Sequence, residues 1–126
     1  INIALGPDAG STFFLPRLVG TANAFELAST GRMVPAAEAL ALGLVDRVVP
    51  AAELDAATQQ LALRYAQAPT AAIGMLKMLL NASTTNDLQA QLNQEAETQD
   101  RAAQTRDAAE GITAFLQKRA AKFEGR

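Results

Sequence analysis

One segment constrains the fold of this chain more than any other. It is TAAIGMLKMLLNAS, residues 70–83, in which Lys77 is the only charged residue. This composition predicts a helix that is apolar on nearly every side, and such a helix has to be covered by more than one neighbour. We therefore expect a helical packing around residues 70–83, and we expect the chain to associate with itself.

The sequence on either side of this segment is also predicted to be helical. An apolar stripe with the spacing i, i+4, i+7 and i+11 indicates a helix that ends before Pro69. Residues 87–106 carry a thinner apolar stripe among glutamines and acidic residues, so this helix needs tertiary support. The stripes consist of Leu54, Thr58, Leu61 and Tyr65 in the first helix and of Leu88, Leu92 and Ala96 in the second.

The last long segment, RDAAEGITAFLQKRAAKF at residues 106–123, is predicted to be an amphipathic helix. Its acidic start, from Asp107 to Glu110, suits the positive end of the helix dipole. We expect the C-terminal end of this helix to carry a basic cluster, formed by Lys118, Arg119 and Lys122.

The chain opens with an alternating apolar pattern that runs into a glycine-rich turn. Ile1, Ile3 and Leu5 would share one face of a strand over residues 1–5. The strand leads into GPDAG, residues 6–10, whose proline, aspartate and glycines are typical of turns. Because the chain starts inside this strand and without a methionine, we expect it to be a fragment.

Helices and one short extended segment are predicted after this turn. Ser11 or Thr12 can cap the first helix with its hydroxyl. A short extended segment over residues 44–49 is closed by Pro50. The predicted helices cover residues 13–19, 22–29 and 36–42, and they end at Gly20, near Gly31 and at Gly43.

Composition and charge exclude several classes of function. Thirteen acidic residues against 11 basic ones give a net charge of −2, which argues against charge-driven binding of nucleic acid or of an anionic membrane. The chain has no cysteine, so it has no disulfide and no thiolate metal site, and we assign no metal. No apolar run approaches the roughly 20 residues that span a bilayer, and the start lacks the basic region of a signal peptide. We expect a soluble, cytoplasmic protein with no nucleic-acid or membrane partner.

Three stretches of the sequence carry a resemblance to a known family. They are LGPDAGSTFFLPRLVG, AFELASTGRMVPAAEALALGLVDRVVP and AEGITAFLQKRAAKF. In this order and at this spacing they resemble the second half of crotonase-superfamily proteins, the enoyl-CoA hydratases and isomerases. The tail APTAAIGMLKMLLNASTTNDLQAQL and the turn PDAGST are most similar to ring-epoxide isomerase-like members that act in phenylacetate breakdown. The resemblance covers essentially the whole chain.

The resemblance implies a fold and an assembly. The fold class would be α+β, mostly α, and would form the C-terminal part of a crotonase-like fold. Residues 1–50 would be the end of the ββα spiral core, and residues 51–126 an all-helical oligomerisation domain of a trimer or hexamer. The backbone amides of the oxyanion hole would belong to the preceding half, so we expect this chain by itself to be inactive.

Asp8 has two interpretations. As part of Pro-Asp-x-Gly it is an ordinary turn residue whose side chain bonds nearby amides. The resemblance instead implies a catalytic aspartate, because isomerase-like members carry one at the matching position where two-glutamate hydratases usually have glycine. The chain has no histidine, which makes carboxylates the prime acid–base candidates. Apolar surroundings raise the pKa of such a base, and Phe13 and Phe14 are candidates to supply them.

Phe115 and Lys118 also have two interpretations. The resemblance implies that they approach the nucleotide of coenzyme A, the lysine holding a phosphate and the ring flanking adenine. By residue type alone, Phe115 is a core residue next to Ile112, and Lys118 with Arg119 is a solvated helix end.

Two classes of function follow from the sequence. The first is an enzyme of the hydratase or isomerase type, which transfers a proton through a thioester enolate on an unsaturated or ring-epoxide acyl-CoA. Coenzyme A would enter as part of the substrate, and no permanently bound cofactor is expected. The alternative is a non-catalytic helical module for oligomerisation or interaction.

Overall fold

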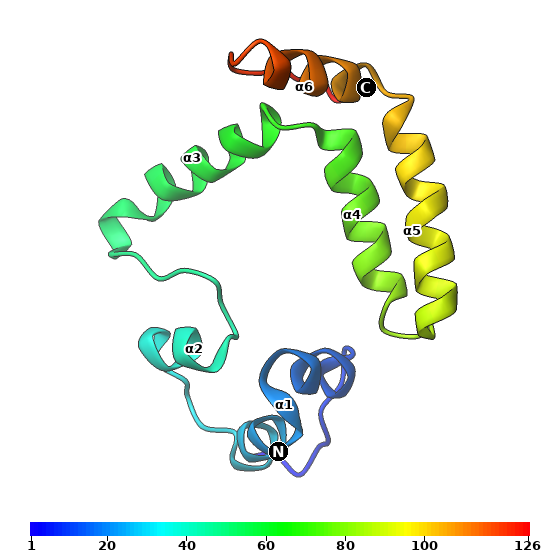
Figure 1. Ribbon diagram of the computed structural model, residues 1–126. Coiled ribbons are helices and arrows are strands. Elements are labelled where there is room, and N and C mark those ends of the chain that lie inside the picture. Colours follow the sequence, from blue (N-terminus) through cyan, green and yellow to red (C-terminus); the bar gives the residue numbers. More distant parts are fainter. The chain divides into compact units, whose positions relative to one another are not determined.

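Helices make up the regular structure of residues 1–126, all of which the computed structural model describes (Figure 1). The chain divides into two compact units, Ile1–Leu54 and Asp55–Arg126. The elements are α1 (Ser11–Thr30), α2 (Ala36–Leu42), the 3₁₀ helix η1 (Ala51–Glu53), α3 (Leu54–Ala66), α4 (Thr70–Ala82), α5 (Leu88–Ala103) and α6 (Arg106–Leu116).

The prediction of a strand over residues 1–5 is wrong for this chain, and the predicted extended segment over residues 44–49 forms no strand either. Residues 1–5 form a tight turn in which the Ala4 N–H donates to the Ile1 carbonyl at 2.9 Å, and Ala4 has a φ of 59°. Residues 44–49 bend without entering a ladder. A strand is held by hydrogen bonds to a second strand, and neither segment has such a partner within residues 1–126. The alternation of apolar residues over residues 1–5 would suit a strand that pairs with another strand, but without a partner the segment does not form one.

The first unit contains the predicted helices, two of them merged into α1. Gly20 has φ 78° and ψ 159°, so α1 consists of two helical pieces that meet at this residue, as its glycine predicts. Gly31 ends α1 and Gly43 ends α2, both in the left-handed conformation. These three glycines therefore delimit the helices where the sequence places their ends.

Arg32 joins the end of α1 to the start of α2. Its guanidinium donates to both carboxylate oxygens of Glu26, at 2.8 and 3.1 Å, and to both of Glu38, at 2.6 and 3.0 Å. The hydrogen bonds from Glu38 and then Glu26 raise the pKa of Arg32, and the bond from Arg32 lowers the pKa of Glu38. The two glutamates, which by position are ordinary surface charges, thus hold two helices together.

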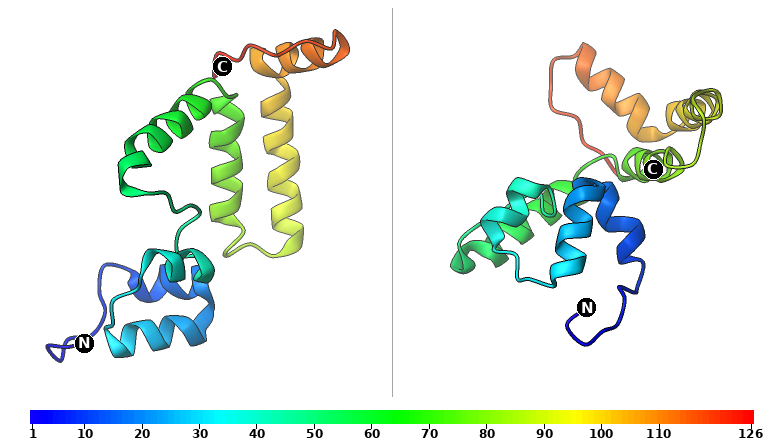
Figure 2. Two further views of the ribbon diagram at one scale, coloured as in Figure 1. Left: turned by 90° about the vertical axis from the view of Figure 1, so that its left-hand side faces the viewer. Right: turned by 90° about the horizontal axis from the view of Figure 1, so that it is seen from below.

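The second unit confirms the predicted succession of helices from α3 to α5. The ribbon views in Figures 1 and 2 show α4 and α5 side by side, and α5 also contacts α6. Asp87 caps α5 by accepting from the Ala90 N–H at 2.8 Å. On α4, Leu76 and Leu80 remain more than half exposed, so the cover that its apolar composition requires is only partly supplied within the unit.

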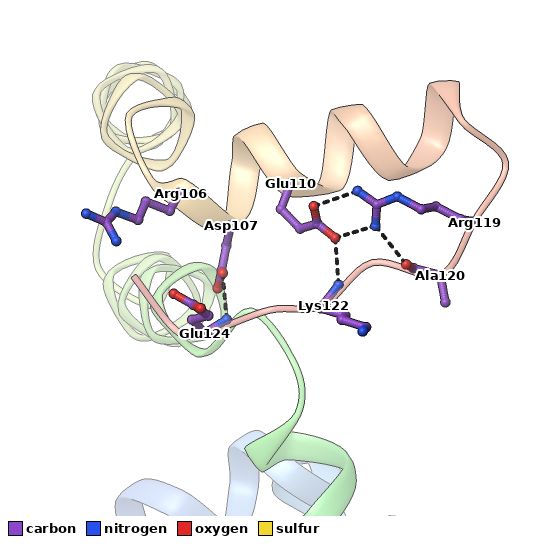
Figure 3. A pocket seen from close by; sticks show the side chains of 7 residues that line it. All are labelled: Arg106, Asp107, Glu110, Arg119, Ala120, Lys122 and Glu124. Carbon is purple, nitrogen blue, oxygen red and sulfur yellow. Dashed lines mark hydrogen bonds and ion pairs between the residues drawn. The ribbon is translucent and has the colours of Figure 1, made fainter.

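The structure ends α6 earlier than the sequence predicts. The helix stops at Leu116, and Lys118 adopts a φ of 52° in the left-handed region. Residues 119–126, which we call the C-terminal strap, then run back along α6 instead of extending it (Figure 3). The acidic start of α6 binds this strap, so the charge pattern reflects pairing across a turn as well as the helix dipole.

Much of the apolar surface of both units is exposed. The buried apolar side chains are small: Val19, Ala24 and Ala114. Phe25 of α1 is 74% exposed and Phe115 of α6 is 82% exposed. No helix has both the length and the apolar character needed to cross a membrane.

Candidate functional site

The Asp8 side chain stands on a tight turn directly before α1. The Ser11 N–H donates to the Asp8 carbonyl at 3.0 Å, and the two residues between them, Ala9 and Gly10, have φ of 52° and 79°. Positive φ at both central residues is the pattern of a type I′ turn. Asp8 is exposed, and no hydrogen bond or ion pair engages its carboxylate. The first interpretation of Asp8, as a turn residue whose side chain bonds nearby amides, therefore lacks its hydrogen bonds.

The aromatic pair after the turn packs on the backbone and on α1. A Cβ atom added to Gly10 would meet the Phe14 ring at 3.0 Å, so the ring needs a glycine at this place in the turn. The Phe13 ring lies edge-on to Phe14 at 5.2 Å between centroids, and the Arg17 guanidinium lies 3.5 Å above the Phe13 ring. Both rings are about half exposed, at 47% and 61%. Within the first unit they fix the turn but do not enclose the Asp8 carboxylate in an apolar pocket.

The expected hydroxyl cap of the first helix is absent. The Gly10 carbonyl accepts from the N–H groups of Phe13 and Phe14, at 2.9 and 3.0 Å, which makes Gly10 the N-cap. Ser11 is therefore already inside the helix, and no side chain caps it. Its Oγ atom is buried without a hydrogen-bond partner.

A groove of about 650 Å³ lies beside this turn within the first unit. Its walls come from the start of the chain and from both pieces of α1, and they are mainly apolar, with Ile1, Leu15 and Leu27 among them. Pro7 and Ser11, on either side of the turn, line it, whereas Asp8 does not. The turn thus carries a free carboxylate at Asp8, next in the chain to Pro7 in the wall of an apolar groove.

Phe115 and Lys118 come together at the end of α6, in the second unit. The Lys118 N–H donates to the Phe115 carbonyl at 3.1 Å, which closes the turn between them. Both side chains are exposed, so the interpretation of Phe115 as a core residue fails within this unit. The turn therefore carries two exposed side chains, one aromatic and one cationic.

Sequence reasoning missed the pairing of Glu110 with the C-terminal strap. Arg119 donates to both oxygens of Glu110, at 2.6 and 2.8 Å, and the Lys122 N–H donates to the same carboxylate at 2.9 Å (Figure 3). The Arg119 bond, followed by the Lys122 backbone bond, lowers the pKa of Glu110 to about 2, and the pKa of Arg119 is raised in turn. The spacing of nine residues matches no helical or strand period, so only the opposite charges were available as a signal.

Comparisons with known proteins bear on the whole chain. A family model described as enoyl-CoA hydratase/isomerase matches residues 1–126. The 1,2-epoxyphenylacetyl-CoA isomerase of Escherichia coli strain K12 is 39% identical over 125 residues, which are 99% of this chain and 48% of the relative. A protein of Rhodobacter capsulatus named "Probable enoyl-CoA hydratase" is 40% identical over 125 residues, 99% of this chain and 49% of the relative.

Solved structures agree with this match. The crystal structure of an enoyl-CoA hydratase from Bacillus anthracis superposes with a TM-score of 0.92 at 34% identity, over 99% of this chain and 48% of that one. The chain thus has the C-terminal part of a crotonase-like fold, and it spans about half the length of the curated relatives it matches. Because the family model covers every residue, the chain belongs to the enoyl-CoA hydratase/isomerase family of the crotonase superfamily.

Proposed function

We propose that the protein carrying this chain acts on an acyl-CoA thioester and that Asp8 transfers a proton at the reacting carbons of the acyl group. The observation that carries this proposal is the Asp8 turn: an exposed carboxylate without a partner, held by an i to i+3 hydrogen bond beside an apolar groove. The family match over all residues supports the choice of substrate class.

The chemistry of a thioester explains why a free carboxylate is needed. A proton next to the thioester carbonyl is weakly acidic, and its removal leaves an enolate whose negative charge lies on the carbonyl oxygen. Asp8 would take this proton and return it at another carbon, acting as base and then as acid. Hydrogen-bond donors stabilise a carboxylate as the anion and make it a weaker base, so a carboxylate without such donors is better suited to take this proton.

The enolate oxygen needs preorganised hydrogen-bond donors, and removing one such donor costs about 10²- to 10³-fold in kcat in a well-studied case. We assign these donors to the part of the relatives that this chain does not span, as the resemblance implies. The 126-residue chain by itself should then have no turnover, and turnover by the purified chain would contradict this assignment.

Proton return at a second carbon favours an isomerase over a hydratase. The resemblance places a catalytic aspartate at Asp8 in isomerase-like members, and one relative at 39% identity is named an isomerase of an epoxide-bearing phenylacetyl-CoA. We infer an unsaturated or ring-epoxide acyl-CoA as the substrate. The groove beside the turn is apolar enough to take such an acyl group.

The nucleotide end of coenzyme A would be bound by Phe115 and Lys118. Their exposure and their position on one turn support this pairing, since a cation can hold a phosphate while the ring flanks adenine. We further propose that the complete protein is a cytoplasmic homo-oligomer.

A second candidate function rests on a different observation. Three apolar side chains of α6 are largely exposed: Ile112 at 64%, Phe115 at 82% and Leu116 at 74%. A group of exposed apolar side chains of this kind is typical of a surface that binds another protein. This surface supports a role as an oligomerisation or interaction module without catalysis. Such a module would use the helices and leave Asp8 idle.

Substitution of Asp8 separates the two functions. In the complete protein we expect Asp8→Asn to reduce kcat by about 10²- to 10⁴-fold on an unsaturated acyl-CoA, since the amide keeps the shape but cannot accept a proton. Asp46→Asn is the matched control, because Asp46 is also exposed in the first unit and has no partner. Wild-type kcat in Asp8→Asn would contradict the enzyme proposal and favour the interaction module.

A further inference from the structure

Asp107 binds the end of the C-terminal strap with its whole side chain. It is only 4% exposed, and its two oxygens accept from the backbone N–H groups of Glu124 and Gly125, at 2.7 and 2.8 Å (Figure 3). The Asp107 N–H in turn donates to the Arg126 carbonyl at 3.0 Å. The last three residues are thus fixed to the first turn of α6 by three hydrogen bonds.

Glu110, one turn further along α6, binds the beginning of the same strap. Its carboxylate takes the two-pronged bond from Arg119 and a third bond from the Lys122 backbone. A forked guanidinium–carboxylate pair defines orientation as well as distance. The strap is therefore attached at both of its ends, by two carboxylates on one face of one helix.

Apolar and steric contacts complete the attachment. A Cβ atom on Gly111 would lie 3.5 Å from the Phe123 ring, so this ring packs over the helix where no side chain stands. Gly125 has a φ of 78°, and a Cβ atom there would overlap the Thr70 Oγ atom at the start of α4. The strap is consequently seated against two helices of the second unit.

The attachment bears on Lys118, which lies between the end of α6 and the strap. Its φ of 52° lies in the left-handed region, which is unfavourable for a residue with a side chain. The end of α6 holds part of this turn, because the Lys118 N–H donates to the Phe115 carbonyl and the Arg119 N–H donates to the Ala114 carbonyl, both at 3.1 Å. Nothing engages the exposed Lys118 side chain itself. Arg119, the next residue, is the one that Glu110 grips.

We propose that Asp107 and Glu110 are positioning residues, which hold the strap and thereby fix the turn that presents Lys118 and Phe115 to the nucleotide phosphates of coenzyme A. This inference rests on the proposed function, because it assumes that Lys118 contacts a phosphate. It adds that the strap orients the lysine together with the backbone hydrogen bonds that close the end of α6. A binding group held in place before the ligand arrives loses less entropy on binding.

The test is a double-mutant cycle on the dissociation constant of coenzyme A, measured by calorimetry on the complete protein. We expect Lys118→Ala to weaken binding about tenfold, which is the loss of one charge-assisted phosphate contact. Glu110→Ala should weaken binding by a similar factor although it touches no ligand. The double variant should be no weaker than either single variant, because both remove the same contact.

Controls make each outcome decisive. Glu97→Ala, at an exposed and unpartnered glutamate of α5, should bind like the wild type. Hydrogen exchange of the Lys122, Glu124 and Gly125 amides should speed up in Glu110→Ala and in Asp107→Ala. If Glu110→Ala fails to fold, Arg119→Gln removes the same ion pair from the strap and takes its place in the cycle.

Two failures are distinguishable. Wild-type affinity in Lys118→Ala would overturn the phosphate contact and the part of the proposed function that rests on it. A clear loss in Lys118→Ala, combined with wild-type affinity in Glu110→Ala while its strap amides exchange freely, would overturn the positioning role alone. Losses that add in the double variant would also overturn it, because the two residues would then act independently.

Discussion

Two aspartates stand near the beginnings of two helices and have opposite surroundings. Asp8, just before α1, is exposed and unbound, whereas Asp107, in the first turn of α6, is buried and accepts from two backbone amides. The Asp107 carboxylate is buried and holds the strap, whereas the Asp8 carboxylate is accessible to a reacting group. The contrast therefore separates a structural carboxylate from one that is free for chemistry.

The largest effect on stability is expected at the structural member of the pair. Asp107→Ala leaves two amides without acceptors, and each unsatisfied group costs about 1–3 kcal/mol, so the free energy of unfolding should fall by about 2–6 kcal/mol. Asp8→Ala removes no bond and should change it by less than about 0.5 kcal/mol. Urea denaturation of both variants measures the difference. Equal losses of unfolding free energy in the two variants would contradict the difference between a structural Asp107 and an unbound Asp8.

Two glycines of the second unit extend the comparison. Gly125 lies in the C-terminal strap and Gly111 of α6 faces it, but the two glycines differ in backbone conformation. Gly125→Ala must adopt a positive φ and displace Thr70, so we expect a loss of about 1–3 kcal/mol in unfolding free energy. Gly111→Ala lies in a helix with ordinary contact distance to Phe123, and it should gain up to about 1 kcal/mol from helix propensity. Thermal unfolding of the two variants checks the opposite signs.

The first unit offers the reverse experiment, in which a strained residue is relieved. Ala9 has a φ of 52° in the Asp8 turn, and replacing it with glycine should raise the free energy of unfolding by about 1 kcal/mol or less, since glycine also gains freedom when unfolded. The turn hydrogen bond from Ser11 to Asp8 should persist, as should the kcat of the complete protein. A destabilised Ala9→Gly variant would show that the turn conformation is not strained.

Local signals in the sequence account for the helices of both units. The glycines at positions 20, 31 and 43 mark helix ends because each adopts a left-handed or non-helical conformation, as glycine readily does. Periodicity places α3, and Asp87 at the start of α5 acts as the cap that its residue type predicts. Such features depend on neighbours within one or two turns, which is the range that a sequence pattern reports.

Long-range pairing accounts for what the sequence does not reveal. The C-terminal strap depends on contacts at separations of nine and seventeen residues, for which no periodic pattern exists. The strand over residues 1–5 needs a partner, and an alternating pattern cannot say whether one is present. Turn chemistry and the family resemblance together make Asp8 a candidate site residue, but that its carboxylate has no hydrogen-bond partner is visible only in three dimensions.

The smallest expected effect concerns the acid range and the Glu110 attachment of the strap. The folded state holds the pKa of Glu110 at about 2, below its ordinary value of 4.5, through the Arg119 bond first and the Lys122 backbone bond second. A lowered pKa in the folded state contributes stability that is complete above pH 4.5 and is lost as the pH falls towards 2. We expect the melting temperature of the wild type to exceed that of Glu110→Gln at pH 6 and to converge with it near pH 2. The side chains of Glu110 and Arg119 are 25% and 40% exposed, so salt should narrow the gap. A gap that does not depend on pH would mean that shape and neutral hydrogen bonds hold the strap, and that the charge of Glu110 contributes nothing to it.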